Sequence, residues 1–296
     1  MKDYDVIIIG AGPAGLSASI FCARSGLTTL LIGDPQKAPW YTAQVDNYPG
    51  INGATGKEIA LAALEQAKQF GAEHLNEEAT SAQQDNEQFI ITTSRLKKFR
   101  TKALIITVGI GRKGFGIPGE KEFKGRGVHE CVLCDGFFYK NKKVAVIGSN
   151  NHAAQEALLL KQFTQDITIL SPREPQFTKE LQEALKGIEV KRVKIKEFKG
   201  TNKLTTVVFE DGEEDFDAVF LALGGAKSFA TQLGLELTKE GFIKVDDEGR
   251  TNIKGVFAAG ACTGAAPQAA KSAGDASAAA IAAIKFVKGI ERYVDY

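Results

Sequence analysis

The chain has few cysteines and few histidines, and each shortage excludes a class of protein. Its 296 residues include four cysteines and three histidines. Four cysteines are too few for the disulfide framework of a small secreted domain. Two cysteines two residues apart make only half a zinc site, and no second pair of cysteines or histidines completes it. We therefore expect neither a disulfide scaffold nor a metal site.

The chain also has no large excess of positive or negative charge and no long apolar run. The formal net charge is +1, which does not favour a nucleic-acid or membrane-surface partner. No run of about 18 apolar residues occurs, so we expect no transmembrane helix. Residues 1–5 lead directly into a strand-like run, without the apolar region of a secretory signal. We expect a cytoplasmic protein.

Glycine is abundant, and its first cluster follows a β-branched run at residues 6–9. Gly10, Gly12 and Gly15 form a G-x-G-x-x-G turn, followed by a predicted helix from Leu16 to Ser25 and a strand at 28–32. Such glycines permit a tight turn and let backbone N–H groups approach a pyrophosphate at the helix N-terminus. The pattern predicts a dinucleotide site, with a purely structural turn as the alternative. Asp34 lies one or two residues from the usual ribose-binding carboxylate, so its role stays open.

A second strand–turn–helix–strand unit begins near residue 143. Its strands are predicted at 143–147 and 166–170, around a helix at 151–163. An amphipathic helix at 57–71, a strand-rich stretch at 73–106 and an alanine-rich helix at 267–288 complete the pattern. We expect an α/β protein with two Rossmann-like nucleotide-binding domains, the second inserted into the first. The first domain would take residues 1–113 and 231–296, and the second residues 114–230.

Cys131 and Cys134 are spaced as Cys-x-x-Cys and are followed directly by Asp135. A pair with this spacing at a helix N-terminus can form a local disulfide and contain a thiol of lowered pKa. Dithiol redox chemistry is therefore the favoured interpretation, with half a metal site or chance spacing as alternatives. Cys22 is expected to be a small buried apolar residue on an early helix, and Cys262 a free thiol.

Several motifs occur in one order along the chain: the turn at 10–15, and segments 46–50, 106–109, 123–127, 131–136 and 251–260. Together they resemble the low-molecular-weight thioredoxin reductase family of FAD-dependent disulfide reductases. The resemblance implies FAD in the first domain, a redox-active disulfide on the second, a thioredoxin-like protein substrate and a homodimer. It assigns FAD binding to Gly10, Gly12, Pro13, Ala14, Gly15, Asn47, Thr107, Gly109, Gly260, Ala261, Gln268 and Ala269.

The same resemblance suggests roles around the cysteine pair. One cysteine would attack the disulfide of the partner and the other would resolve the mixed disulfide, in an order that the sequence does not give. Cys134 would exchange electrons with the flavin. Asp135 would be the general acid for the leaving thiolate, or a helix N-cap. His129 could be the acid instead, but a histidine in a surface loop is the expected interpretation.

The second nucleotide unit departs from the family pattern. Asn150 stands where a binding turn needs glycine, and its side chain would obstruct the approach of a pyrophosphate. NADPH-specific members carry several arginines after the next strand, whereas here only Arg173 remains, followed by Glu174. We therefore expect NADPH binding to be lost. This resembles the ferredoxin-dependent flavin thioredoxin reductases, and an acidic ferredoxin would dock on a basic strip such as 95–102 or 191–196.

The flavin domain also departs at two positions. Ala261 replaces an aspartate of the closing motif, and Pro267 replaces the arginine before Gln268. FAD is still expected because the first glycine turn and Asn47 match, while FMN or a second flavin stays open. Tyr293 and Tyr296 could stack on a flavin ring, although terminal aromatics more often pack or fray.

The leading hypothesis is a flavoprotein disulfide reductase that passes electrons from a donor other than NADPH through FAD and the Cys131–Cys134 dithiol to thioredoxin or a similar protein. One alternative is an ordinary NADPH-dependent thioredoxin reductase. The other is a non-enzymatic flavin-binding redox sensor that has degenerated from the enzyme.

Overall fold

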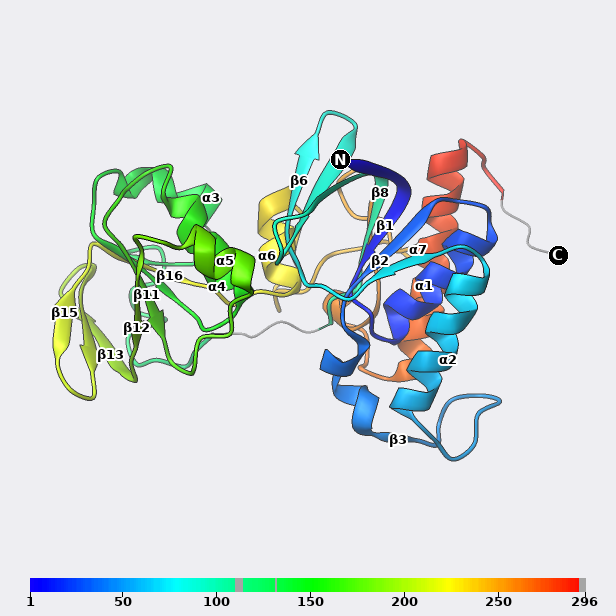
Figure 1. Cartoon of the computed structure of the whole chain (residues 1–296), viewed down its shortest axis with the longest axis horizontal. Helices are drawn as coiled ribbons and strands as arrows, with labels where there is room; N and C mark the ends of the chain where they lie inside the picture. The colour runs from blue at the N-terminus through cyan, green and yellow to red at the C-terminus, as the bar shows by residue number, and fades with distance from the viewer. Residues whose placement is uncertain (110–113, 131, 293–296) are drawn as a thin grey trace. The chain divides into compact units, whose positions relative to one another are not determined.

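The computed structural model describes residues 1–109, 114–130 and 132–292, and for Leu133 and Cys134 the backbone alone. The described chain divides into two compact units, each drawn in Figure 1. The first unit comprises residues 1–93, 97–109 and 225–292, and the second comprises residues 94–96, 114–130 and 132–224.

The first unit is built on a seven-stranded mixed sheet, ordered β5-β2-β1-β8-β7-β6 with β17 also paired to β8. The central strands are parallel, and the β6–β7–β8 part is antiparallel. The bounds are β1 Lys2–Ile9, β2 Thr29–Ile32, β5 Glu73–Leu75, β6 Ala79–Asp85, β7 Gln88–Thr93, β8 Lys98–Ile106 and β17 Val256–Ala258. A short hairpin, β3 Gln44–Val45 and β4 Ala54–Thr55, lies outside this sheet.

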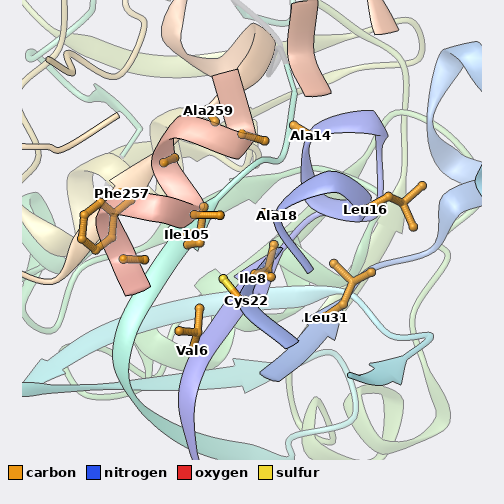
Figure 2. Close-up of a cluster of buried hydrophobic side chains, with 14 of the residues drawn as sticks. Val6, Ile8, Ala14, Leu16, Ala18, Cys22, Leu31, Ile105, Phe257 and Ala259 are labelled. Atoms are coloured by element: carbon orange, nitrogen blue, oxygen red, sulfur yellow. The ribbon is translucent and has the colours of Figure 1, made fainter. Parts of the chain in front are cut away.

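Helices cover both faces of this sheet, which explains why β1 is a continuous apolar run. Val6 and Ile8 contribute to the core under α1 and α7, whereas Ile7 and Ile9 contribute to the opposite core with α6. Figure 2 shows Ala18 and Cys22 of α1 above Val6 and Ile8. The helices are α1 Pro13–Arg24, α2 Gly56–Gln69, α6 Ala226–Leu233 and α7 Ala269–Lys288, with short 3₁₀ turns η1 Pro35–Lys37, η2 Pro39–Thr42 and η4 Gly260–Thr263.

The second unit repeats the parallel arrangement on a smaller scale. Its five-stranded parallel sheet has the order β12-β11-β10-β16-β9, and a separate antiparallel sheet has the order β13-β14-β15. The strands are β9 Val128–His129, β10 Val144–Ile147, β11 Ile167–Ser171, β12 Glu189–Arg192, β13 Ile195–Gly200, β14 Leu204–Phe209, β15 Glu213–Asp215 and β16 Ala218–Leu221. The helices are α3 Val132–Asp135, η3 Gly136–Tyr139, α4 Asn151–Leu160 and α5 Lys179–Ala184.

Two sheets with parallel central strands, each with a strand–turn–helix start, confirm the predicted α/β fold with two Rossmann-like halves. The predicted boundary near residue 230 falls inside α6, a helix of the first unit that contacts β6. The helix predicted at 151–163 ends at Leu160, and the one predicted at 267–288 begins at Ala269. Within the described residues, no helix is long and apolar enough to cross a membrane.

Candidate functional site

The first glycine turn joins β1 to α1, and its glycines serve different purposes. A Cβ at Gly15 would lie 1.7 Å from the carbonyl oxygen of Gly10, so the helix can approach the turn only without a side chain. A Cβ at Gly12 would meet nothing within 4 Å, and Gly12 has an ordinary φ of −79°. The protein itself therefore does not require glycine at position 12. The open space there is what the close approach of a ligand pyrophosphate needs.

A cavity of about 530 Å³ adjoins this turn in the first unit. Thr107 holds the end of β1 beside it, because its hydroxyl donates to the carbonyl oxygens of Ile9 and Gly10 at 2.9 Å each. Gln268 accepts a 2.9 Å hydrogen bond at Oε1 from the Asn47 amide. The predicted residues that line the cavity are Gly10, Gly12, Pro13, Ala14, Thr107, Gly109, Ala261, Gln268 and Ala269. Asn47 contacts this set through its hydrogen bond to Gln268. Gly15 belongs to the same glycine turn as Gly10 and Gly12.

Asp34, whose role the sequence leaves open, lines the cavity. It caps η1 by accepting from the Gln36 amide at 3.0 Å, so one carboxylate oxygen already has a backbone partner. Two other cavity residues were not predicted from the sequence. Lys37 and Trp40 follow in the next turns. The indole Nε1 of Trp40 is buried, with no acceptor among the described residues. Two prolines, which open η1 and η2, were the only local signal that this stretch folds against the cavity.

The second glycine turn has a different construction. Asn150 caps α4, because its Oδ1 accepts from the Ala153 amide at 3.1 Å. The segment after β11 is hydrogen-bonded to the turn itself: the Arg173 amide donates to the Ser149 hydroxyl at 3.1 Å, and the Gln176 amide donates to the Ser149 carbonyl at 2.7 Å. A cavity of about 610 Å³ remains beside this turn, with Arg173 and Glu174 in its lining.

The two basic strips considered for donor docking are largely ion-paired. In the strip at 95–102, Lys97 lies 2.6 Å from Glu77 and Lys102 lies 2.8 Å from Asp5. In the strip at 191–196, acidic partners lie within 3.3 Å of three cations. These pairs are Lys191–Glu214, Arg192–Glu174 and Lys194–Glu210. Most of this positive charge is therefore matched within the chain.

Of the predicted catalytic residues, Cys131 lies outside the described residues, and so does the side chain of Cys134. The backbone of Cys134 belongs to α3. Asp135 ends α3 with a side chain that is 33% exposed. It takes the N-cap position of η3, but its side chain makes no capping hydrogen bond there among the described residues. The Oδ2 atom of Asp135 instead lies 3.1 Å from Nδ1 of His129.

His129 is a buried strand residue, so the expectation of a surface-loop histidine was wrong. It is only 7% exposed, because β9 pairs with β16 and places the imidazole on the ring of Phe220. Its Nε2 lies 2.7 Å from the Tyr139 hydroxyl. Burial first, and then the charges of Asp135 and Asp217, raise the pKa of Tyr139. Asp135, His129 and Tyr139 thus form one connected set of polar side chains, from residues on both sides of the cysteine motif.

A second carboxyl group contacts the backbone of the cysteine motif, and it was not identified from the sequence. Glu156 on α4 is 9% exposed, and its Oε2 accepts from the Val132 amide at 3.3 Å. Burial raises the pKa of Glu156 to about 7. His152, one turn earlier, places Nε2 3.8 Å from Oε1 of Glu156. The available signal was this histidine–glutamate pair at i and i+4 within an otherwise apolar helix.

Two adjacent phenylalanines follow the motif on η3 and face solvent. Phe137 is 67% exposed and Phe138 is 73% exposed. Exposed aromatic side chains next to a reactive segment are typical of protein docking surfaces. The arrangement favours a protein substrate over a small molecule.

The remaining two thiols are structural. Cys22 and Cys262 are free and buried, as expected, and burial raises the pKa of each to about 12. The Sγ atom of Cys262 lies 3.3 Å from the Ile106 carbonyl oxygen. Neither thiol can ionise readily near neutral pH. Tyr293 and Tyr296 lie outside the described residues.

Comparisons with known proteins agree with this geometry. The family model described as pyridine nucleotide-disulphide oxidoreductase matches residues 4–278. The thioredoxin reductase of Listeria innocua is 36% identical over 274 residues, covering 88% of this chain and 86% of its own length. The atypical thioredoxin reductase TRi from Desulfovibrio vulgaris Hildenborough superposes with a TM-score of 0.91 at 37% identity, covering 98% of this chain and 99% of its own. A ferredoxin-flavin thioredoxin reductase from Clostridium acetobutylicum gives a TM-score of 0.74 at 28% identity, with the same coverage.

Proposed function

The chain belongs to the low-molecular-weight thioredoxin reductase family of pyridine nucleotide-disulphide oxidoreductases, and from this premise we propose that it reduces a thioredoxin-like protein disulfide with electrons from a donor other than NADPH. As a member, it is a flavoprotein disulfide reductase. The proposal that the donor is not NADPH depends on one observation, the hydrogen bonding of the second glycine turn. There Asn150 caps the helix and residues 171–176 are hydrogen-bonded back onto the turn.

The family implies FAD, and the residues of the first unit fit it. Gly12 leaves space for a pyrophosphate at the N-terminus of α1, and the linked Asn47 and Gln268 present amide groups beside the cavity. The buried Nε1 of Trp40 is an unused donor in the same lining. FAD, when bound, supplies a carrier that accepts electrons from the donor and reduces a disulfide. Gly12, Asn47 and Gln268 are the residues we assign to holding it.

The second unit lacks what NADPH requires. A 2′-phosphate is bound by several forked or cationic donors. Here Arg173 is followed by Glu174, whose carboxylate pairs with Arg192 at 3.0 Å. The side chain of Asn150 also occupies the position where the middle glycine of a binding turn admits the pyrophosphate. We therefore assign the second unit to carrying the dithiol, and not to binding NADPH.

We propose a ferredoxin-type donor. The likeness to the ferredoxin-flavin thioredoxin reductase of C. acetobutylicum supports this choice. The ion pairing of both basic strips argues against their use as its docking surface. Reduction of the substrate depends on Cys131 and Cys134. Phe137 and Phe138 are the exposed apolar residues that would contact a thioredoxin-like partner. Assembly as a homodimer is a proposal that rests on the family alone.

The donor claim is tested by anaerobic titration of the holoenzyme. One equivalent of NADPH should leave the visible absorption band of the oxidised flavin unchanged, whereas dithionite should bleach it. Reduced thioredoxin should then form only after dithionite or a reduced ferredoxin has been supplied. Fast bleaching by stoichiometric NADPH would restore the ordinary NADPH-dependent enzyme and overturn the donor claim.

The flavin site is tested by a matched pair of glycine variants. Gly12→Val should leave the fold intact, because its Cβ meets no protein atom, yet the purified protein should contain little FAD. Gly15→Ala should lower stability instead, because its Cβ would lie 1.7 Å from a backbone oxygen. Flavin content by absorbance and thermal unfolding by circular dichroism separate the two. Full flavin content in a folded Gly12→Val protein would place FAD elsewhere.

A further inference from the structure

The connected set Asp135–His129–Tyr139 places an imidazole against the carboxyl group that follows Cys134 in the sequence. Asp135 follows Cys134 directly, and its Oδ2 lies 3.1 Å from His129 Nδ1. The other ring nitrogen lies 2.7 Å from the Tyr139 hydroxyl. We infer that His129 is a positioning residue for the reaction, which holds the Asp135 carboxyl group in place for proton transfer to a leaving thiolate.

The chemistry of the three groups sets the direction of each hydrogen bond. An ionised carboxylate only accepts, so His129 Nδ1 donates to Asp135. A neutral imidazole then has an acceptor at Nε2, to which the Tyr139 hydroxyl donates. The raised pKa of Tyr139 keeps this hydroxyl protonated. One tautomer of His129 is thus selected, and the ring is fixed in orientation between Phe220 and Tyr139, whose centroids lie 5.5 Å and 5.2 Å from its own.

The surroundings contain few other charges that face the imidazole. Asp135 comes from α3 and Tyr139 from η3, and the contact from β16 is the apolar ring of Phe220. The charge of Asp217 acts on the Tyr139 hydroxyl. The Nζ atom of Lys142 lies 3.9 Å from Oδ1 of Asp217. Next to His129 in the chain, Glu130 is paired with Lys124 at 2.9 Å. Among the described residues, the printed titratable contacts of the ring are therefore Asp135 at Nδ1 and Tyr139 at Nε2.

The inference rests on the proposed function, because it needs a reduced Cys131–Cys134 pair. One enzyme thiolate attacks a substrate sulfur, the substrate S–S bond breaks, and the departing sulfur leaves as a thiolate that takes one proton. The second enzyme thiolate attacks the mixed disulfide, forms the Cys131–Cys134 bond and releases the other substrate sulfur, which takes a second proton. Two electrons pass to the substrate. The two protons lost by the dithiol equal the two that the substrate gains.

The test uses two disulfides that differ in their need for an acid. The holoenzyme is reduced anaerobically with dithionite, freed of excess reductant, and mixed with either bis(2-hydroxyethyl) disulfide or 5,5′-dithiobis(2-nitrobenzoate). The alkyl thiolate leaves poorly without a proton, whereas the aromatic thiolate leaves without one. In His129→Gln, the single-turnover rate with the alkyl disulfide should fall by roughly tenfold to a hundredfold at neutral pH. The rate with the aromatic disulfide should stay within about twofold of wild type.

Companion variants separate positioning from packing. Tyr139→Phe keeps the ring but loses the hydroxyl, and should give a smaller loss with the same selectivity for the alkyl disulfide. Tyr4→Phe removes a comparable hydroxyl, bonded to Glu73 at 2.9 Å in the first unit, and should change neither rate.

Each outcome decides a different claim. Equal losses with both disulfides in His129→Gln would mean that the histidine is only structural, and unchanged rates would remove its role altogether. A reduced wild-type enzyme that reacts with neither of these disulfides nor with oxidised thioredoxin would overturn the proposed function itself. Normal wild-type rates with an unselective variant would overturn only the inference about His129.

Discussion

Replacing either Cys131 or Cys134 with serine should abolish reduction of thioredoxin, lowering turnover by roughly three orders of magnitude or more. A serine hydroxyl does not ionise near neutral pH and cannot form a disulfide. Flavin content should be unaffected, because the residues that fit FAD belong to the other unit. Steady-state turnover with a dithionite-fed donor, together with the flavin spectrum, measures both expectations.

The same variants reveal which cysteine attacks first, a point that the sequence leaves open. The variant that keeps the attacking cysteine should accumulate a stable mixed disulfide with thioredoxin, because the resolving thiol is absent. Cys22→Ala and Cys262→Ala are the matched controls, since burial raises the pKa of both thiols to about 12 and removes them from thiolate chemistry. Substantial turnover in the Cys131→Ser, Cys134→Ser double variant would contradict dithiol chemistry and favour a non-enzymatic flavoprotein.

The features predicted well from the sequence are those set by local spacing. The run at residues 6–9 and the glycines at 10, 12 and 15 define a strand, a turn and a helix start within one short segment, and the structure confirms them. The burial of Cys22 follows from its place on a helix whose small residues face the sheet. The fold also brings together residues predicted for one site, as with Thr107 beside Gly10, while their binding roles stay predictions.

The features missed depend on contacts between distant parts of the chain. His129 looks like a loop residue until β9 pairs with β16, which places Phe220 against its ring. The amide of Asn150 looks like an obstruction to a ligand, and the fold shows that it also caps α4. The basic strips looked like docking surfaces, but their acidic partners lie on other strands and turns. Periodicity and motif spacing carry no information on such pairings.

The departures in the second unit have a common physical consequence. Asn150 at the turn, and the hydrogen bonds that tie residues 171–176 to Ser149, replace interactions that a bound nucleotide would otherwise make. Backbone donors that are already satisfied gain little from a ligand, and displacing them would leave polar groups unpaired. The unit therefore stabilises its own turn, which supports the proposal that it carries the dithiol and does not bind NADPH.

Glu156→Gln should stabilise the protein at alkaline pH and leave it nearly unchanged at acidic pH. Glutamate titrates at about 4.5 when unfolded, and burial raises the pKa of Glu156 to about 7 in the fold. Between these values the folded chain holds one proton more than the unfolded chain, so stability falls as pH rises through the window. Above about pH 7 the full penalty of the buried carboxylate applies, which is about 3 kcal/mol. Glutamine keeps an oxygen for the Val132 amide but does not titrate.

Urea unfolding followed by circular dichroism near pH 5 and near pH 8 measures this effect. The wild-type midpoint should drop between the two, and the Glu156→Gln midpoint should drop much less, so that the difference between the proteins grows with pH. Glu183→Gln is the matched control, because the Glu183 side chain is 69% exposed and its charge carries little desolvation cost. His152→Gln tests the imidazole that lies 3.8 Å from Glu156. A wild-type and Glu156→Gln pair with parallel pH dependence would show that the carboxyl group behind the cysteine motif is ionised at no cost, and that it cannot hold a proton there near neutral pH.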